Sequence, residues 1–443
     1  MIRRRLLLLA ACAPLLLAAP RAHAMPIERV ASPGGIVAWL VQDRTLPLLS
    51  MQFRFRGGTA GEGIGAQGAA RLAVDMLDEG AGDLDATAFA RALQEHSISL
   101  SVGASADSIQ GSLRVLDAHR ARGAELLRLA LAAPRFDADA LERVRTRTLA
   151  GLQRQQEDPR SILREAFGRL AWGAHPYGEG AEAEIASVRG ATVEGMRGFL
   201  ARRMARDNLV VGVVGNIDAA ALGALLDQVF GGLPARAAPY DVPEARPAID
   251  AERVVVVRRA TPQALVMSGA PGMKRDDPDW FAAQLVNYVL GGGGFNSRLM
   301  TEMREKRGLT YGVSTAYHAL DRGALVFASF STDNARAGEA LELLRAQWRR
   351  MGEEGPGEQE LEDAKAYMTG AFALSLDSSA AVAGLLVTLQ HEGLGMDYLS
   401  RRDALIRGVT IEDARRVARR MHGAPGFLTV VVGEPAGVRG EGG

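Results

Sequence analysis

Three glycines near the start of the chain form a pattern that can bind a dinucleotide. Gly63-x-Gly65-x-x-Gly68 follows a predicted strand and opens a predicted helix. In a dinucleotide site, one helix leads directly to another parallel strand, and the pyrophosphate lies at the helix N-terminus. Here a second helix and a hairpin are predicted to follow, so we favour a structural turn over a cofactor site.

A second pattern, Gly312-x-Ser314-x-Ala316, resembles the sharp turn that exposes a nucleophilic serine. That turn needs glycine at its last position and a helix immediately after the serine. This segment begins a predicted strand instead. Ser314 is therefore predicted to be an ordinary strand residue.

Side chains that bind metals are scarce and scattered. The histidines beyond residue 24 are His96, His119, His175, His318, His391 and His422. Two ligands on one helix must lie about one turn apart to share a face. Only His318 and Asp321 come close, in a predicted hairpin turn, and we favour a turn over a metal site there. The segment 175–178 is predicted to end a helix.

The first 24 residues have the pattern of a secretory signal peptide. Arginines precede an apolar run from Leu6 to Leu17, and Ala22-His23-Ala24 provides a small-x-small cleavage site. The run is shorter than the ~20 residues that span a bilayer, and no later stretch is long enough. The only cysteine, Cys12, lies in a sequence that resembles a lipobox, so its lipidation remains open. We expect an exported, periplasmic protein with no membrane span after cleavage.

Composition excludes several classes of protein. The chain has 443 residues, of which 47% are hydrophobic and 23% are charged, so it can form two cores of ordinary size. Removal of residues 1–24 and their four arginines leaves 48 basic against 52 acidic side chains, a net charge of −4. A nucleic-acid-binding protein needs a basic surface. Without Cys12 the chain has no disulfide, no thiolate nucleophile and no Cys-bound metal.

The predicted elements repeat in the same order. A strand pair, a helix pair, a second strand pair, a run of helices and a final strand occupy 25–233 and occur again in 251–443. Four prolines between them predict a linker over 234–250. Such a duplication indicates an α+β fold of two similar domains that face each other across a cleft.

Four segments are distinctive: GAQGAARLAVDMLDEG (65–80), EDP (157–159), NLVVGVVGNI (208–217) and GGGGFNSRLMTEMREKRGLTY (291–311). They resemble segments of the pitrilysin/insulinase family of zinc metallopeptidases. The resemblance covers nearly the whole chain beyond residue 24. It implies two homologous α/β-sandwich domains that form half of a clamshell.

The family's metal motif is missing from this chain. Its members carry H-x-x-E-H on the first of these helices, where two histidines hold Zn²⁺ and the glutamate activates a water molecule. The corresponding positions here hold Arg71, Val74 and Asp75, and the stretch 144–156, where a third ligand would fall, contains no acidic residue. We therefore predict that this chain binds no metal and is not catalytic alone.

A second feature of the family is retained. Arg304 and Tyr311 match an Arg/Tyr pair that contacts substrate across the cleft in related enzymes. A guanidinium and a phenol are fixed donors that can hold a peptide carbonyl. The alternative is that Arg304 pairs with Glu302 or Glu305 and that Tyr311 packs in the core.

The family includes heterodimers in which one subunit carries H-x-x-E-H and the other carries the Arg/Tyr pair. The resemblance implies that this chain is the non-catalytic, substrate-binding subunit of an exported heteromeric zinc endopeptidase, with peptide as substrate and zinc on a homologous partner. A peptide-binding or assembly scaffold without a protease partner is the alternative. The glycines at 291–294 could form a flexible loop or a tight turn.

Overall fold

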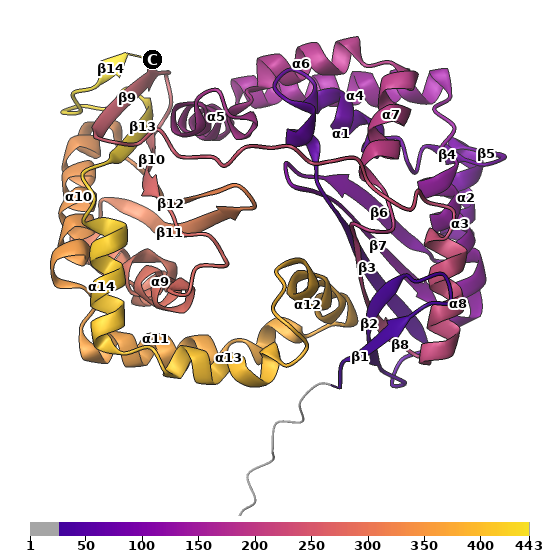
Figure 1. Ribbon diagram of the computed structural model, residues 1–443. Coiled ribbons are helices and arrows are strands. Elements are labelled where there is room, and N and C mark those ends of the chain that lie inside the picture. Colours follow the sequence, from indigo (N-terminus) through magenta and orange to yellow (C-terminus); the bar gives the residue numbers. More distant parts are fainter. Residues whose placement is uncertain (1–25, 443) are drawn as a thin grey trace, which may run out of the picture.

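The computed structural model describes residues 26–442. The predicted signal peptide and Cys12 lie outside these residues. Two six-stranded sheets lie in opposite halves of the chain, with helices on their outer sides and at both ends of the space between them (Figure 1). This arrangement confirms the predicted α+β class with two similar units.

The first sheet has the strand order β1-β2-β8-β3-β7-β6. Its strands are β1 (Glu28–Ala31), β2 (Val37–Gln42), β3 (Leu48–Arg56), β6 (Ser99–Ala104), β7 (Ser108–Leu116) and β8 (Leu209–Gly215). A separate two-stranded ribbon joins β4 (Gly80–Ala81) to β5 (Leu84–Asp85).

The second sheet, taken from its other edge, has the order β14-β9-β13-β10-β12-β11. Its strands are β9 (Glu252–Arg258), β10 (Ala264–Pro271), β11 (Thr310–Leu320), β12 (Gly323–Thr332), β13 (Phe427–Gly433) and β14 (Glu441–Gly442). In both sheets the second and third strands in this order are parallel, and the next three pairings are antiparallel. The two halves therefore share one topology, and only the outermost strand pairs differently.

The helices of the first half precede the linker region. They are α1 (Gln67–Asp75), α2 (Ala86–Glu95), α3 (Arg120–Ala132), α4 (Ala138–Glu157), α5 (Pro159–Trp172), α6 (Ala181–Gly190), α7 (Val193–Arg203) and α8 (Ala219–Phe230). Local sequence explains several helix starts. Asp158, for example, accepts a hydrogen bond from the backbone of Ser161, and Pro159 takes the first helical position, where no donor is needed.

The helices of the second half follow the same plan. They are α9 (Trp280–Asn287), α10 (Ala337–Glu354), α11 (Glu358–Gly370), α12 (Ser379–His391), α13 (Tyr398–Arg407) and α14 (Ile411–His422). Figure 1 shows α10 and α14 on the outer side of the second sheet, and α3 and α8 on the outer side of the first.

One helix from each half packs against the sheet of the other half. Helix α5 packs its Phe167 and Trp172 into a cluster with side chains of β10 and β13 of the second sheet. Helix α12 packs Val382 and Leu386 against Val214 and Val41 of the first sheet. The contact is close, because a Cβ at Gly212 of β8 would lie 2.4 Å from a backbone oxygen of α12.

Most predicted elements lie within a few residues of the observed ones, and some differ in kind. Apolar residues at helical spacing predict helices near 278–290 and 297–307, and these segments contain π-helical turns at Tyr288–Gly292 and Met300–Glu305. The same spacing predicts a helix over 358–376, and the observed helix ends at Gly370. Helix α6 and the short strands β1, β4, β5 and β14 were not predicted.

No single helix among residues 26–442 is long and apolar enough to cross a membrane. One pair of helical segments, Glu358–Leu376 and Ser379–His391, reaches that length and composition only together, and the pair is bent by 118°.

Candidate functional site

The altered metal motif lies on α1, and its residues are engaged in other contacts. The Nε atom of Arg71 lies 2.8 Å from Oε1 of Glu184 on α6, and its Nη1 atom lies 3.4 Å from the carbonyl oxygen of Ala104 at the end of β6. Val74 is 1% exposed and belongs to the first core. Burial raises the pKa of the Asp75 carboxyl group, while Arg71 and Arg147 act in the opposite direction.

Helix α4 contributes more cations to the same region. Arg143 lies 2.7 Å and Arg147 lies 3.4 Å from the carboxylate of Glu79. Arg147 comes from the stretch in which the family would place a third metal ligand. Ion pairs between guanidinium and carboxylate groups thus surround the positions of the altered metal motif on α1.

The donor set does not fit a zinc ion. Zinc in proteins is bound by His, Cys and carboxylate side chains that converge on one point. No group of three or more such side chains that could hold a metal occurs within residues 26–442. His318 and Asp321, the pair considered from the sequence, do not form such a group either. Oδ1 of Asp321 faces Nε2 of His391 at 3.4 Å, and no metal-binding cluster occurs there among the described residues.

The glycines around the start of α1 serve packing. Gly65 has a φ angle of 86°, and its N–H group donates a 2.7 Å hydrogen bond to Glu179. A Cβ at Gly68 would lie 2.4 Å from the carbonyl oxygen of Glu184, so α1 and α6 are in close contact there. This geometry agrees with a structural turn. Ser314 lies within β11, as an ordinary strand residue.

Arg304 and Tyr311 lie side by side on the second half. The guanidinium carbon of Arg304 is 5.0 Å from the centre of the Tyr311 ring and 4.5 Å from the centre of the Phe295 ring. Both distances are within the range of a cation–π contact. Phe295, which follows the glycine run, was not predicted to take part.

The structural alternative for the pair is wrong. Tyr311 is 85% exposed and does not pack in the core. The carboxylate of Glu302 accepts hydrogen bonds from Lys306 at 2.7 Å and from Arg307 at 2.6 Å. Among the described residues, no carboxylate forms an ion pair with Arg304.

The glycine run that leads to this pair is closely packed and spans the end of the π-helical turn Tyr288–Gly292. The N–H group of Gly293 donates to the carbonyl oxygen of Tyr288 at 2.8 Å. A Cβ at Gly291 would lie 2.7 Å from the Thr315 side chain. Gly294 has a φ angle of 58°, a conformation that glycine adopts without strain. Gly291 and Gly292 thus end the π-helical turn Tyr288–Gly292, and Gly293 and Gly294 lead from it into the next short helical turn.

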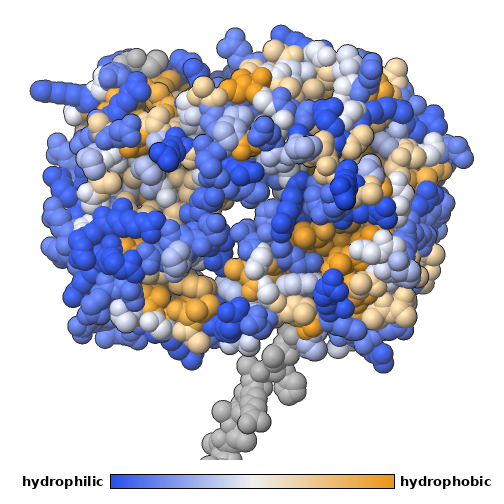
Figure 2. Space-filling model, viewed as in Figure 1, coloured by the Kyte–Doolittle hydropathy of each residue, from blue (hydrophilic) through white to orange (hydrophobic). Residues whose placement is uncertain are grey.

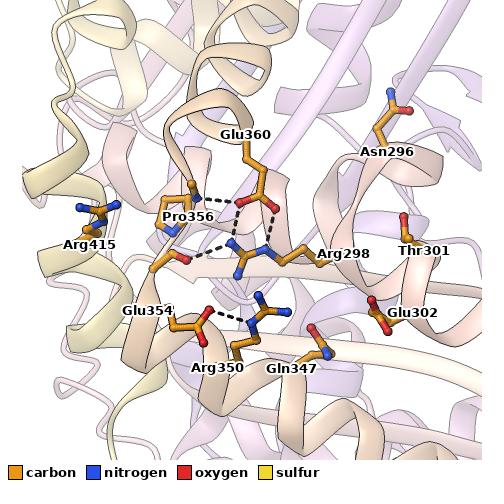
Figure 3. A pocket seen from close by; sticks show the side chains of 12 residues that line it. Asn296, Arg298, Thr301, Glu302, Gln347, Arg350, Glu354, Pro356, Glu360 and Arg415 are labelled. Atoms are coloured by element: carbon orange, nitrogen blue, oxygen red, sulfur yellow. Dashed lines mark hydrogen bonds and ion pairs between the residues drawn. The ribbon is translucent and has the colours of Figure 1, made fainter.

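A partly buried ion pair anchors the start of the next helical turn. Arg298 binds both carboxylate oxygens of Glu360 on α11 and also the carbonyl oxygen of Gly355 (Figure 3). Burial tends to raise the pKa of Glu360, but hydrogen bonds from Arg298 and Gly357 outweigh it and lower the pKa. These residues line a cavity of about 480 Å³. The anchor fixes the segment that carries Arg304.

A larger cavity lies between the two halves. It has a volume of about 810 Å³ and is bordered by Arg56 of the first half, by β11 and α9, and by Thr388 and His391 of α12. In Figure 2 an opening is visible at the centre of the molecule, between surfaces that are mainly hydrophilic.

Comparisons with known proteins agree with this description. A family model described as the peptidase M16 inactive domain matches residues 190–368. The non-peptidase homolog YmxG of Helicobacter pylori is 26% identical over 358 residues, which is 81% of this chain and 82% of that protein. The mitochondrial-processing peptidase subunit beta of Lentinula edodes is 22% identical over 337 residues, or 70% of this chain and 68% of that protein.

A solved structure agrees over almost the full length. The peptidase M16 inactive domain from Pseudomonas fluorescens has a TM-score of 0.85 and 27% identity, and the match covers 94% of this chain and 99% of that one. Together with the shared topology and the replaced metal motif, these matches confirm the predicted resemblance of the chain to the M16 zinc metallopeptidases, the pitrilysin/insulinase family, and in particular to a domain described as inactive.

Proposed function

We propose that this chain is the non-catalytic, substrate-binding subunit of an exported, periplasmic, heteromeric zinc endopeptidase. One observation carries the proposal. In a chain whose metal motif has been replaced by ion pairs, Arg304 has no carboxylate partner among the described residues and lies against a Tyr311 ring that is 85% exposed.

The chemistry of the pair suits a peptide. The N–H groups of a guanidinium lie in its plane, and they can hold a carbonyl or carboxylate oxygen with defined geometry. A phenol adds a further donor. Two such donors, fixed before substrate arrives, stabilise negative charge that develops on a peptide carbonyl.

The partner would supply the metal centre. Arg71, Val74 and Asp75 offer no ligand set, so any zinc in the complex belongs to a homologous subunit with H-x-x-E-H. The similarity to a mitochondrial-processing peptidase subunit supports a paired assembly. Strands β6 and β11 are edge strands of their sheets, and extended peptides commonly bind by adding to such an edge.

Reconstitution tests the proposal. The chain would be purified from its native source and its companions identified, and a homologue with H-x-x-E-H would then be expressed with and without it. We expect cleavage of an unstructured peptide only when both chains are present. A homologue that is equally active alone, or a native preparation without any zinc-bearing companion, would favour the scaffold instead.

A further inference from the structure

Three side chains from separate segments meet at the candidate substrate-binding position. The ring centre of Phe295 is 4.5 Å and that of Tyr311 is 5.0 Å from the guanidinium carbon of Arg304. Phe295 comes from the turn after the glycine run, Arg304 from a π-helical turn, and Tyr311 from the start of β11. The guanidinium group therefore contacts two aromatic rings.

Neither ring is placed there by the hydrophobic core. Phe295 is 64% exposed, and Tyr311 is 85% exposed. A large apolar ring that is mostly in water gains little from burial. Both rings instead contact the guanidinium group of Arg304.

The turn that carries Phe295 is fixed on both sides. Ser297, which is fully buried, donates from its hydroxyl group to the carbonyl oxygen of Gly294 at 2.8 Å. The N–H group of Ser297 reaches the same oxygen at 3.1 Å. Arg298, next in the chain, holds Glu360. The backbone of Phe295 is thus held in a short turn between anchored residues.

We propose that Phe295 is a positioning residue for Arg304. An arginine side chain has several rotatable bonds, and each one that must be ordered when a ligand binds weakens binding. Contact with the Phe295 ring uses the face of the guanidinium group and leaves its in-plane N–H groups for an oxygen ligand. That this ligand is a peptide carbonyl or carboxylate rests on the proposed function; the positioning itself does not.

Nuclear magnetic resonance of the arginine side chains in the chain from residue 25 onward tests the positioning directly. The Nε–Hε signal of Arg304 would be assigned by its loss in Arg304→Lys. We expect a high order parameter for this group in the wild type and in Phe295→Tyr, and a clearly lower one in Phe295→Ala and Phe295→Leu. An unchanged order parameter in Phe295→Ala overturns the proposal, and so does full retention in Phe295→Leu, because bulk alone would then suffice.

Phe372 provides a matched control. Its ring centre lies 4.1 Å from the guanidinium carbon of Arg402, well separated in sequence from this group. Phe372→Ala removes an equivalent ring from an equivalent contact. The Arg304 signal should keep its order parameter in this variant; a loss equal to that in Phe295→Ala would mean that general loosening, and not the local ring, is responsible.

Activity of a reconstituted complex separates this inference from the proposed function. Phe295→Ala should lower kcat/KM about two- to fivefold, the effect of losing one exposed cation–π contact, and Phe295→Tyr should restore it. If Arg304→Ala lowers activity but Phe295→Ala does not, the positioning role fails and the subunit role stands. If neither has an effect, the subunit role fails, and the order parameters alone decide the positioning role.

Discussion

The hydroxyl group of Tyr177 donates a 2.5 Å hydrogen bond to Oδ1 of Asp107. Asp107 lies in the turn between β6 and β7, and its Oδ2 atom accepts a hydrogen bond from the N–H group of Asp321 at 3.1 Å. The N–H group of Arg322 in turn donates to the Tyr177 oxygen at 3.1 Å. One carboxylate therefore joins the hairpin tips of the two sheets.

This junction predicts a pH dependence of stability. Burial raises the pKa of Asp107, while hydrogen bonds from Tyr177 and Asp321 act in the opposite direction. Because the pKa is higher in the folded than in the unfolded chain, the contribution of Asp107 to stability is complete below its ordinary pKa and declines as pH rises through the folded value.

Asp107→Asn removes that titration. We expect the difference in unfolding free energy between wild type and Asp107→Asn to shift against the wild type as pH is raised from about 4 to 7. Denaturant unfolding of both proteins at several pH values measures it. A difference that stays constant over this range would contradict the prediction. Asp43→Asn is the control, because hydrogen bonds from Thr45 lower the pKa of Asp43 and so move its titration toward the acid end of this range or below it.

The isolated chain should bind no stoichiometric zinc and cleave no unstructured peptide. The reason is the replacement of the metal motif by Arg71, Val74 and Asp75 and the cations that α4 brings to the same region. Elemental analysis of the purified protein, with and without chelator, provides the measurement. About one tightly held zinc per chain, lost together with peptidase activity, would show the prediction to be wrong.

Restoring the motif should not create a peptidase. In Arg71→His/Val74→Glu/Asp75→His the third ligand is still missing, and Val74→Glu places a carboxylate where the side chain is 1% exposed. Such burial without a partner costs on the order of 3 kcal/mol or more.

The double variant Arg71→His/Asp75→His is the control, because both positions are partly exposed. We expect near-wild-type stability from the double variant and a markedly lower melting temperature from the triple variant. Robust zinc-dependent turnover by the triple variant would contradict the prediction.

Arg304 and Tyr311 give the sharpest functional test. In a complex with a zinc-bearing partner, Arg304→Ala or Tyr311→Phe should lower kcat/KM by about 10²–10³, the cost of one lost donor to a developing oxyanion. Arg304→Lys should not restore full activity, because an ammonium group lacks the planar fork. The partner's metal content and the melting temperature should not change.

A smaller loss, about tenfold, would indicate a role in binding the ground state. Wild-type kinetics in both variants would remove the main support for a protease subunit. Glu305→Ala, next to Arg304 and exposed, is a control that should keep full activity.

The sequence allowed most elements to be predicted, because apolar residues repeat with clear helical or strand periods. Helix α6 was not predicted, because its apolar stripe is weak. Its buried residues are only Ala181, Ile185, Ser187 and Val188. The packing of α5 and α12 against the sheets of the opposite halves could not be predicted, because an apolar helix face does not specify which sheet it will cover.

The candidate site was predictable in part. Arg304 and Tyr311 are close in sequence and lie together as the resemblance implied. The partner of Arg71 was not predictable, because Glu184 lies 113 residues further along the chain and its α6 was itself unpredicted. Phe295 could be noticed next to the glycines, but only the folded turn brings its ring to Arg304.

Because α5 and α12 each pack against the sheet of the opposite half, the first half has a structural role that does not depend on a metal site. A fragment starting after the linker would lack α5 and leave Met267, Val430 and Val432 of the second sheet open to water. A fragment ending before the linker would likewise lack α12 over Val214. Each half thus completes the hydrophobic packing of the other, and we expect neither half to fold stably when it is expressed alone.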